Sequence, residues 1–172
     1  MIAGMEATDL LAAALDIERH VAADGWDQPP LLFALVPTAR IRAEQPDLAA
    51  RLGVTEGGPA LTSFEQDRPP ADTELDEFLG GIEWPDPIVA AAVVLERIVL
   101  PPDAEAEVLA HPDVTTAAHR HPAAQEMRIV VAASRDGRTM CALRLRGHDD
   151  ESVLTGADLV PGLAEALLAT FR

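Results

Sequence analysis

The chain begins and ends with helical patterns of apolar residues. Near the start, apolar side chains recur every three or four residues, at Leu10, Ala14, Ile17 and Val21. This spacing places them on one face of a helix, and Asp24-Gly25 supplies a stop signal. A second stripe follows Asp158, at Leu159, Leu163, Leu167 and Phe171. We therefore predict an amphipathic helix near each end of the chain.

Between these helices, several segments have the apolar or alternating character of strands. They are residues 31–36, 60–66, 88–100, 127–134 and 139–146. The β-branched content of 88–100 favours a central strand covered on both faces, although its alanines leave a helix open. Short helices are expected after Thr38, over 46–52 and over 72–79. Residues 103–125, which Pro112 and Pro122 interrupt, are expected to form a short helix-and-loop excursion.

This order of elements predicts an α+β fold. We expect an antiparallel sheet of about four to five strands packed against N- and C-terminal helices, ending in a β-hairpin plus helix. The length suits a single α+β domain over residues 1–172. Strands and helices alternate too irregularly for a doubly wound parallel sheet. The sequence also contains no GxGxxG or GxxxxGK[ST] motif, which excludes the standard nucleotide cradles.

The turn SRDGRT (134–139) allows two hairpin registers. A two-residue turn would set Arg144 against Ile129 and mix charge with apolar residues on one face. A three-residue turn with Gly137 in the left-handed region shifts the pairing by one residue. The pairs are then Met127 with Leu145, Ile129 with Leu143, and Val131 with Cys141. Because a buried face selects the register that keeps it apolar, we predict the bulged turn.

That register gathers arginines on the opposite face of the hairpin. Arg128 lies opposite Arg144, and Arg146 opposite Glu126. Like charges that face each other cost stability, so Arg128 and Arg144 are expected to share a carboxylate. The candidate interaction face comprises Arg128, Arg138, Met140, Arg144 and Arg146. Three interpretations remain open: an internal cover by an acidic helix such as 103–107 or 72–77, a subunit or protein-partner surface, and a small-anion site.

A second candidate site lies at the end of the same hairpin. Extending the ladder brings the segment AHRHP towards HDDE, so His119, His121, His148 and Asp150 could converge. Imidazole and carboxylate groups together are plausible transition-metal ligands. However, neither H-x-H nor H-D-D is an established ligand spacing. A solvated pair of loops with one His–Asp ion pair is the alternative.

Charge and composition exclude several classes of protein. The chain has 29 acidic residues, 13 basic residues and a formal net charge of -16, which argues against nucleic-acid binding. No apolar run reaches the length of about 18 residues that a membrane span needs, so we expect no membrane insertion. The single cysteine excludes an internal disulfide and fits the cytoplasm. Catalytic motifs are missing, GxSxG among them, and no cofactor is expected.

Four segments carry a resemblance to a known family. They are HVAADGWDQPPLLFALVPT (20–38), EWPD (83–86), VVLERIVLPP (93–102) and HDDESVLTGADLVPGLAEALLATF (148–171). The chain resembles an uncharacterised family of single-domain proteins from high-G+C actinobacteria. The resemblance implies a bacterial cytoplasmic protein and carries no assigned activity. In outline, the expected fold is also similar to secretion-chaperone-like folds, and fold alone does not give function.

The sequence therefore favours a non-catalytic protein-interaction or accessory module, chaperone-like or regulatory. Its partner would be another protein, or a second copy in a homodimer, bound through the arginine-rimmed face. The alternative is a metal-binding protein or metal-dependent enzyme that uses the histidines and Asp150. A ligand pocket between sheet and helices is a third possibility.

Overall fold

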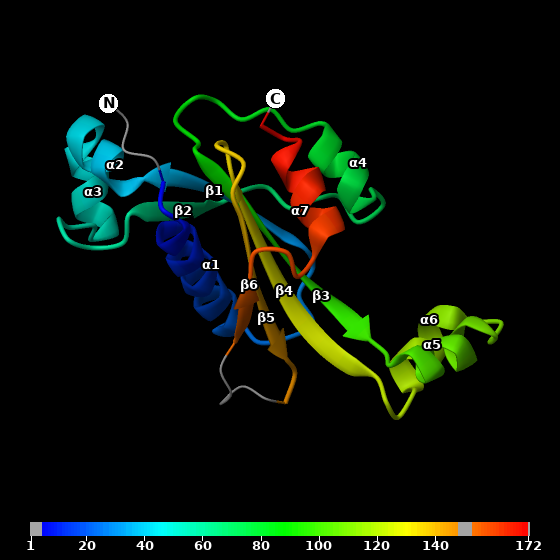
Figure 1. Ribbon diagram of the computed structural model, residues 1–172. Helices are drawn as coiled ribbons and strands as arrows, with labels where there is room; N and C mark the ends of the chain where they lie inside the picture. Colours follow the sequence, from blue (N-terminus) through cyan, green and yellow to red (C-terminus); the bar gives the residue numbers. More distant parts are fainter. Residues whose placement is uncertain (1–4, 148–152, 172) are drawn as a thin grey trace.

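A six-stranded antiparallel sheet forms the centre of the computed structural model, which describes residues 5–147 and 153–171 (Figure 1). The strands are β1 (Leu31–Pro37), β2 (Leu61–Glu65), β3 (Ala90–Val99), β4 (Gln125–Ser134), β5 (Thr139–Leu145) and β6 (Leu154–Gly156). Their order across the sheet is β2-β1-β3-β4-β5-β6. The helices are α1 (Ala7–Ala22), α2 (Thr38–Glu44), α3 (Pro46–Leu52), α4 (Leu75–Gly80), α5 (Pro102–Leu109), α6 (Val114–Arg120) and α7 (Pro161–Leu168). This architecture confirms the α+β fold.

Helices cover both faces of the sheet. On one face, Leu10, Ala14 and Ile17 of α1 pack against alternate residues of the central strands, such as Phe33 and Val130. On the other face, α7 and α4 pack against the intervening residues. Residues Ala90–Leu95 of β3 are buried, as expected for a central strand with both faces covered. No helix in the described parts of the chain is long and apolar enough to cross a membrane.

The β4–β5 hairpin has the predicted bulged-turn register. Met127 pairs with Leu145, Ile129 with Leu143 and Val131 with Cys141. Gly137 has a φ of 93°, a conformation that glycine adopts without the steric cost of a Cβ. Cys141 is fully buried in the core beneath α7.

The strand β6 is an addition to the predicted sheet. It pairs along Cys141–Leu143 of β5 and forms the sheet's edge next to α7 in the chain. A strand of three residues is too short to show alternation, so the sequence pattern did not indicate it. The last helix begins at Pro161, slightly later than the expected start after Asp158.

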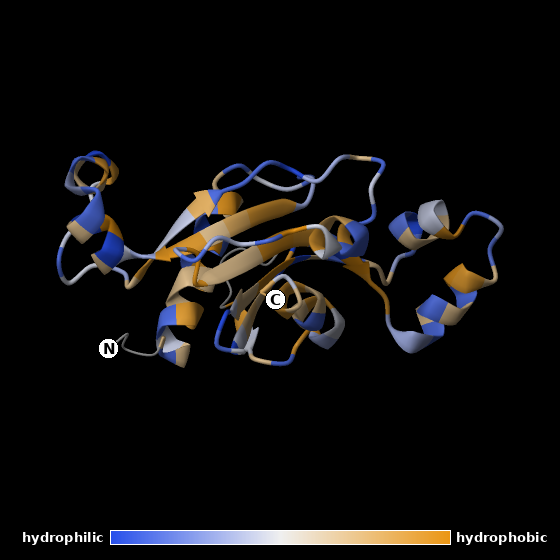
Figure 2. Cartoon of the chain, turned by 90° about the horizontal axis from the view of Figure 1, so that it is seen from above, coloured by the Kyte–Doolittle hydropathy of each residue, from blue (hydrophilic) through white to orange (hydrophobic). Residues whose placement is uncertain are grey.

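The helices α5 and α6 form an arm that projects beyond the ends of β3 and β4 (Figures 1 and 2). The arm, residues 101–124, is the excursion predicted between the two long strands. Ala104 and Val108 of α5 are buried, whereas no residue of α6 is. Two large apolar side chains of the arm, Leu109 and Val114, are 64% and 41% exposed. The arm therefore presents apolar surface away from the core.

Candidate functional site

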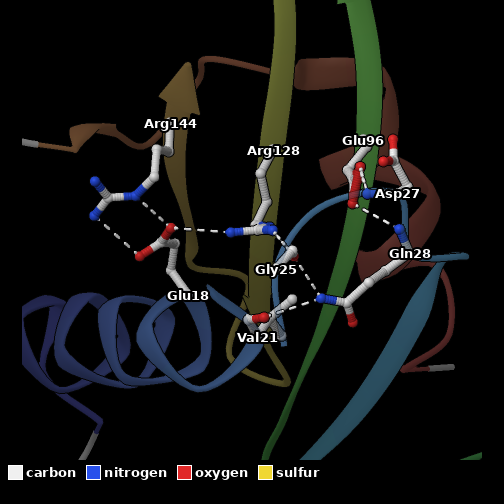
Figure 3. A network of polar contacts seen from close by, with 8 residues as sticks. All are labelled: Glu18, Val21, Gly25, Asp27, Gln28, Glu96, Arg128 and Arg144. Atoms are coloured by element: carbon white, nitrogen blue, oxygen red, sulfur yellow. Dashed lines mark hydrogen bonds and ion pairs between the residues drawn. The ribbon is translucent and has the colours of Figure 1, made fainter. Parts of the chain in front are cut away.

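Helix α1 packs on the arginine face of the β4–β5 hairpin (Figure 3). Glu18 projects from α1 and lies between Arg128 of β4 and Arg144 of β5. Its carboxylate accepts hydrogen bonds from Nε and Nη2 of Arg144, at 2.5 and 3.2 Å, and lies 3.7 Å from Nη1 of Arg128. The predicted shared carboxylate is thus confirmed. The internal cover of the arginine face is therefore confirmed. The helix that covers it is α1, and the two acidic segments suggested for this role, 103–107 and 72–77, do not cover it.

Burial makes this cluster part of the protein interior. Glu18 and Arg128 are each 1% exposed, and the Arg144 side chain is 14% exposed. Arg128 also donates to the carbonyl oxygen of Gly25, and its guanidinium stacks 4.4 Å from the ring centre of Trp26. Its Nε is buried without a hydrogen-bond partner among the described residues. Arg128 can therefore contact another protein only if α1 moves.

The remaining members of the candidate face lie at its margins. Arg138 pairs with Asp136 beside the turn and is 46% exposed, and Met140 packs partly buried on the core. Arg146 is 40% exposed and bridges two acids, Asp27 and Glu126. These two acids line the groove described below.

The structure describes two of the four candidate metal ligands. His121 contacts Glu107 through Nε2, at 2.9 Å, and accepts the N–H of Ala123 through Nδ1. His119 contacts the Thr115 carbonyl through Nδ1. Both nitrogens of His121 are thus engaged within the arm. His148 and Asp150 lie outside the described residues, and in the part that is described no three metal-ligating side chains come together.

The long strand β3 has an open edge over its second half. Its ten residues all pair with β4, but β1 pairs only with Ala90–Val94. Because the Gln66 N–H bonds to the Leu32 carbonyl, even-numbered residues of β1 direct their backbone groups towards β2 and odd-numbered ones towards β3. The odd-numbered residues of β1 pair with Ala90, Ala92 and Val94, which leaves the odd-numbered residues of β3 to direct their backbone groups towards β4. Even-numbered residues therefore direct theirs to the other side. No backbone hydrogen bond joins Glu96 or Ile98 to a described residue on that side.

The chain before β1 explains why pairing stops at Val94. Two prolines, Pro29 and Pro30, come directly before Leu31, and proline has no N–H to donate to a ladder. The segment before them is held instead by the Glu96 side chain. Its carboxylate accepts the backbone N–H groups of Asp27, at 2.7 Å, and Gln28, at 3.0 Å (Figure 3). Asp27 has a φ of 66° and is the single non-glycine residue with positive φ among those described.

A groove of about 400 Å³ lies beside this edge. Its strand wall is formed by Glu96, Arg97 and Ile98, and its helix wall by one side of α6. The lining residues of α6 are Val114, Thr115, Ala118 and His119, and Asp27 and Glu126 complete the lining. The groove therefore combines a strand edge, a helix surface with both apolar and polar side chains, and three carboxylates.

Two acids at the groove are held by one arginine. Arg146 donates from Nη1 and Nη2 to the Asp27 carboxylate, at 2.9 and 3.2 Å, and from Nη1 to Glu126. These hydrogen bonds, first with Asp27 and then with Glu126, raise the pKa of the Arg146 guanidinium above its usual value. The guanidinium of Arg146 also lies over Trp26, at 5.7 Å from the ring centre. This arrangement ties the loop before β1 to the β4–β5 hairpin.

The helix wall has its own N-terminal cap. The Asp113 side chain accepts the N–H of Thr116 at 3.2 Å. Hydrogen bonding with Thr116 lowers the pKa of the Asp113 carboxyl below its ordinary value of 3.8. As the folded-state pKa is lowered, this contact stabilises α6 above the ordinary carboxyl pKa and is lost as the pH falls through the lowered value. The helix wall is therefore capped at neutral pH.

The groove was not among the predicted sites, although the sequence carried a signal for it. The apolar run 88–100 is about twice the length of its neighbour 31–36, and the latter is preceded by two prolines. Together these features predict a strand that outruns its partner. No local sequence pattern predicted that α6 lies beside that edge.

The comparisons place the chain in a family without adding an activity. No curated protein and no solved structure matches it. The model of one family, described as PPA1309-like protein, matches residues 10–172. This match covers most of α1 and all later helices and strands, including both walls of the groove. The chain therefore belongs to the PPA1309-like protein family.

Proposed function

We propose that this protein is a non-catalytic interaction module that binds another protein in the groove between β3 and α6. The observation that carries the proposal is the open edge of β3 facing an exposed helix. Unpaired strand edges readily pair with other chains, and proteins usually cover or interrupt them. In this protein, the second half of β3 has neither a pairing strand nor an interruption on that side, and a groove lies beside it. A role as an accessory or regulatory protein of the cytoplasm is consistent with this arrangement.

The apolar surface near the groove supports the same proposal. Val99 is 41% exposed at the end of β3, and Val114 is equally exposed at the start of α6. Leu109, at the end of α5, is more exposed still. Apolar groups of this kind, rimmed by polar residues, are typical of surfaces that bind other proteins. Of the arginine face, Arg146 holds two acids that line the groove, Asp27 and Glu126, whereas Arg128 helps to attach α1.

Site-specific photocrosslinking in the native cell tests this proposal. A photoreactive residue at Thr115, which is exposed and lines the groove, is expected to give one discrete adduct with another protein. The same residue at Arg51, exposed on α3 at the opposite end of the molecule (Figure 1), is the control. We expect the adduct to disappear when Ala118→Trp fills the groove.

A matched variant separates groove filling from general damage. Ala123→Trp places the same side chain on an exposed part of the arm outside the lining, and it should leave the adduct intact. An equal yield from Thr115 and Arg51, or an adduct that survives Ala118→Trp, contradicts the proposal. An adduct between two copies of the chain would identify the alternative partner, a homodimer.

A further inference from the structure

We infer that the groove binds its partner as an added β-strand, and that this strand is an extended segment rich in basic and apolar residues. The inference rests on the proposed function and specifies the partner and the binding mode. It follows from three features of the groove: the direction of the free backbone groups, the spacing of the helix wall, and the charge.

The backbone groups on the open edge point where an added strand would lie. Ile98 directs its N–H and C=O away from β4, and the described chain supplies no backbone partner for them. The next even-numbered residue, Glu96, has the same orientation. A strand paired here would repeat the hydrogen-bond pattern that β1 makes with Ala90, Ala92 and Val94. Main-chain bonding of this kind is the basis of recognition by strand addition.

The helix wall supplies the contacts that the strand edge lacks. Val114 and Ala118 are four residues apart, as are Thr115 and His119, so both pairs lie on one side of α6. An extended peptide between this helix and β3 would place alternate side chains towards the helix. Small residues, such as Ala118 and Thr115, leave room for them. The groove is therefore shaped for a strand and a row of alternate side chains.

The charge around the groove favours a basic peptide. The arm contains four acids and one arginine, and Asp27, Glu96 and Glu126 add three carboxylates to the lining. Two basic groups, Arg97 and Arg146, offset part of this charge. A second copy of the chain would bring the same acids and a net charge of -16 to the contact, which opposes pairing of two β3 edges. A basic partner segment fits better than self-association.

Binding of defined peptides to the purified full chain tests the inference. The first probe is a fluorescein-labelled ten-residue peptide of alternating arginine and valine, and the second is the same peptide with every backbone N–H methylated. Methylation keeps the charge but removes the donors that a strand needs, so we expect affinity to fall by at least about tenfold. A third probe with glutamate in place of arginine should bind at least about tenfold more weakly than the first.

Substitutions at Ile98 separate the backbone from the side chain. Ile98→Pro removes an N–H that points to the open edge and leaves the bonds between β3 and β4 in place, a position where proline is tolerated. Ile98→Ala keeps the N–H and shortens the side chain. We expect Ile98→Pro to lose more affinity than Ile98→Ala, by about fivefold or more. Circular dichroism of both variants verifies that they are folded.

Hydrogen exchange gives a readout that survives if Ile98→Pro fails to fold. In the unmodified chain, the Ile98 amide should exchange more slowly when the first peptide is bound, while the exposed amides of α3 are unchanged. Equal binding of the methylated peptide, with no protection of Ile98, overturns strand addition. If no probe binds but the Thr115 adduct forms in cells, the inference fails and the proposed function stands. Dimerisation that Ile98→Pro abolishes would replace the basic partner with a second copy.

Discussion

At the scale of single residues, the buried Glu18 joins α1 to the β4–β5 hairpin. Its carboxylate is the shared counter-charge of two arginines that the register forces to lie opposite each other, Arg128 and Arg144. Arg144 is held bidentately, a geometry that suits the planar guanidinium. Without the carboxylate, two like charges would face each other beneath α1. The acid on α1 therefore makes the register of the hairpin compatible with burial.

Removal of this charge should destabilise the protein strongly. Glu18→Gln keeps the size of the side chain but removes the carboxylate that faces the buried guanidinium of Arg128, which is 1% exposed. We expect a loss of about 3 kcal/mol in the free energy of unfolding, measured by urea titration. Glu44→Gln removes an exposed partner of Arg40, whose bond to Glu44 spans 3.0 Å, and should cost less than about 1 kcal/mol. Equal losses would show that the buried cluster adds nothing special.

The same reasoning limits what charge reversal at this face can reveal. Arg128→Glu would place a carboxylate next to Glu18 in a buried site, and the chain would lose stability as well as any partner. Arg146 is a better position for such tests, since its side chain is 40% exposed. Loss of an interaction in Arg128→Glu therefore does not identify a binding surface.

At the scale of elements, the β4–β5 hairpin shows how a turn and a buried face agree on one register. Gly137 adopts a positive φ, and the pairing that follows places Ile129 and Cys141 on the face beneath α7. A slip by one residue would move the whole apolar set to the wrong face. The turn and the core thus impose the same alignment independently.

Two glycine-to-alanine substitutions should differ in their effect on stability. Gly137→Ala places a Cβ on a residue with φ of 93°, and should cost about 1–2 kcal/mol although no atom lies within 4 Å of that Cβ. Gly162→Ala, in the first turn of α7, also meets no atom within 4 Å and has no positive φ. It should be neutral or stabilise by up to about 1 kcal/mol because alanine favours helix. Thermal and urea unfolding measure both, and equal effects would refute the conformational explanation.

At the scale of the whole molecule, the protein consists of a sheet with covered faces and an arm at one end (Figure 2). The two cores lie on opposite faces of the sheet, and neither includes a residue of α5 or α6. The arm instead supplies one wall of the groove. The helix wall of the groove thus lies outside both cores, so we expect the arm to be replaceable without loss of the sheet.

Replacement of the arm tests this separation. Val99 and Gln125 are paired across β3 and β4, so residues 100–124 can be replaced with Asn-Gly, which closes a two-residue hairpin. We expect a folded protein by circular dichroism, with a Tm within about 5 °C of the parent, because the cores remain. Binding of the arginine–valine peptide should fall by at least about tenfold. Unfolding of this variant would mean that the arm is required for the fold.

Much of this architecture could be predicted from the sequence alone. Apolar periodicity indicated the terminal helices and five of the strands, and the contrast between apolar and arginine faces selected the hairpin register. These features are local or involve neighbouring strands, so side-chain spacing carries the information. The shared carboxylate followed from the like charges of Arg128 and Arg144. Its source did not, because α1 and the hairpin are 126 residues apart at the contact.

Only the tertiary structure decided which surfaces are free. The sequence pattern left open whether the arginine face is covered, and α1 covers it. The same pattern predicted a central strand for β3, and the edge of its second half faces a groove. Whether a surface is covered depends on packing between elements far apart in the chain, which periodicity does not encode. The sequence by itself determined the elements, the register and the acidity. Packing of α1 and the position of α6 determined which of them can meet a partner.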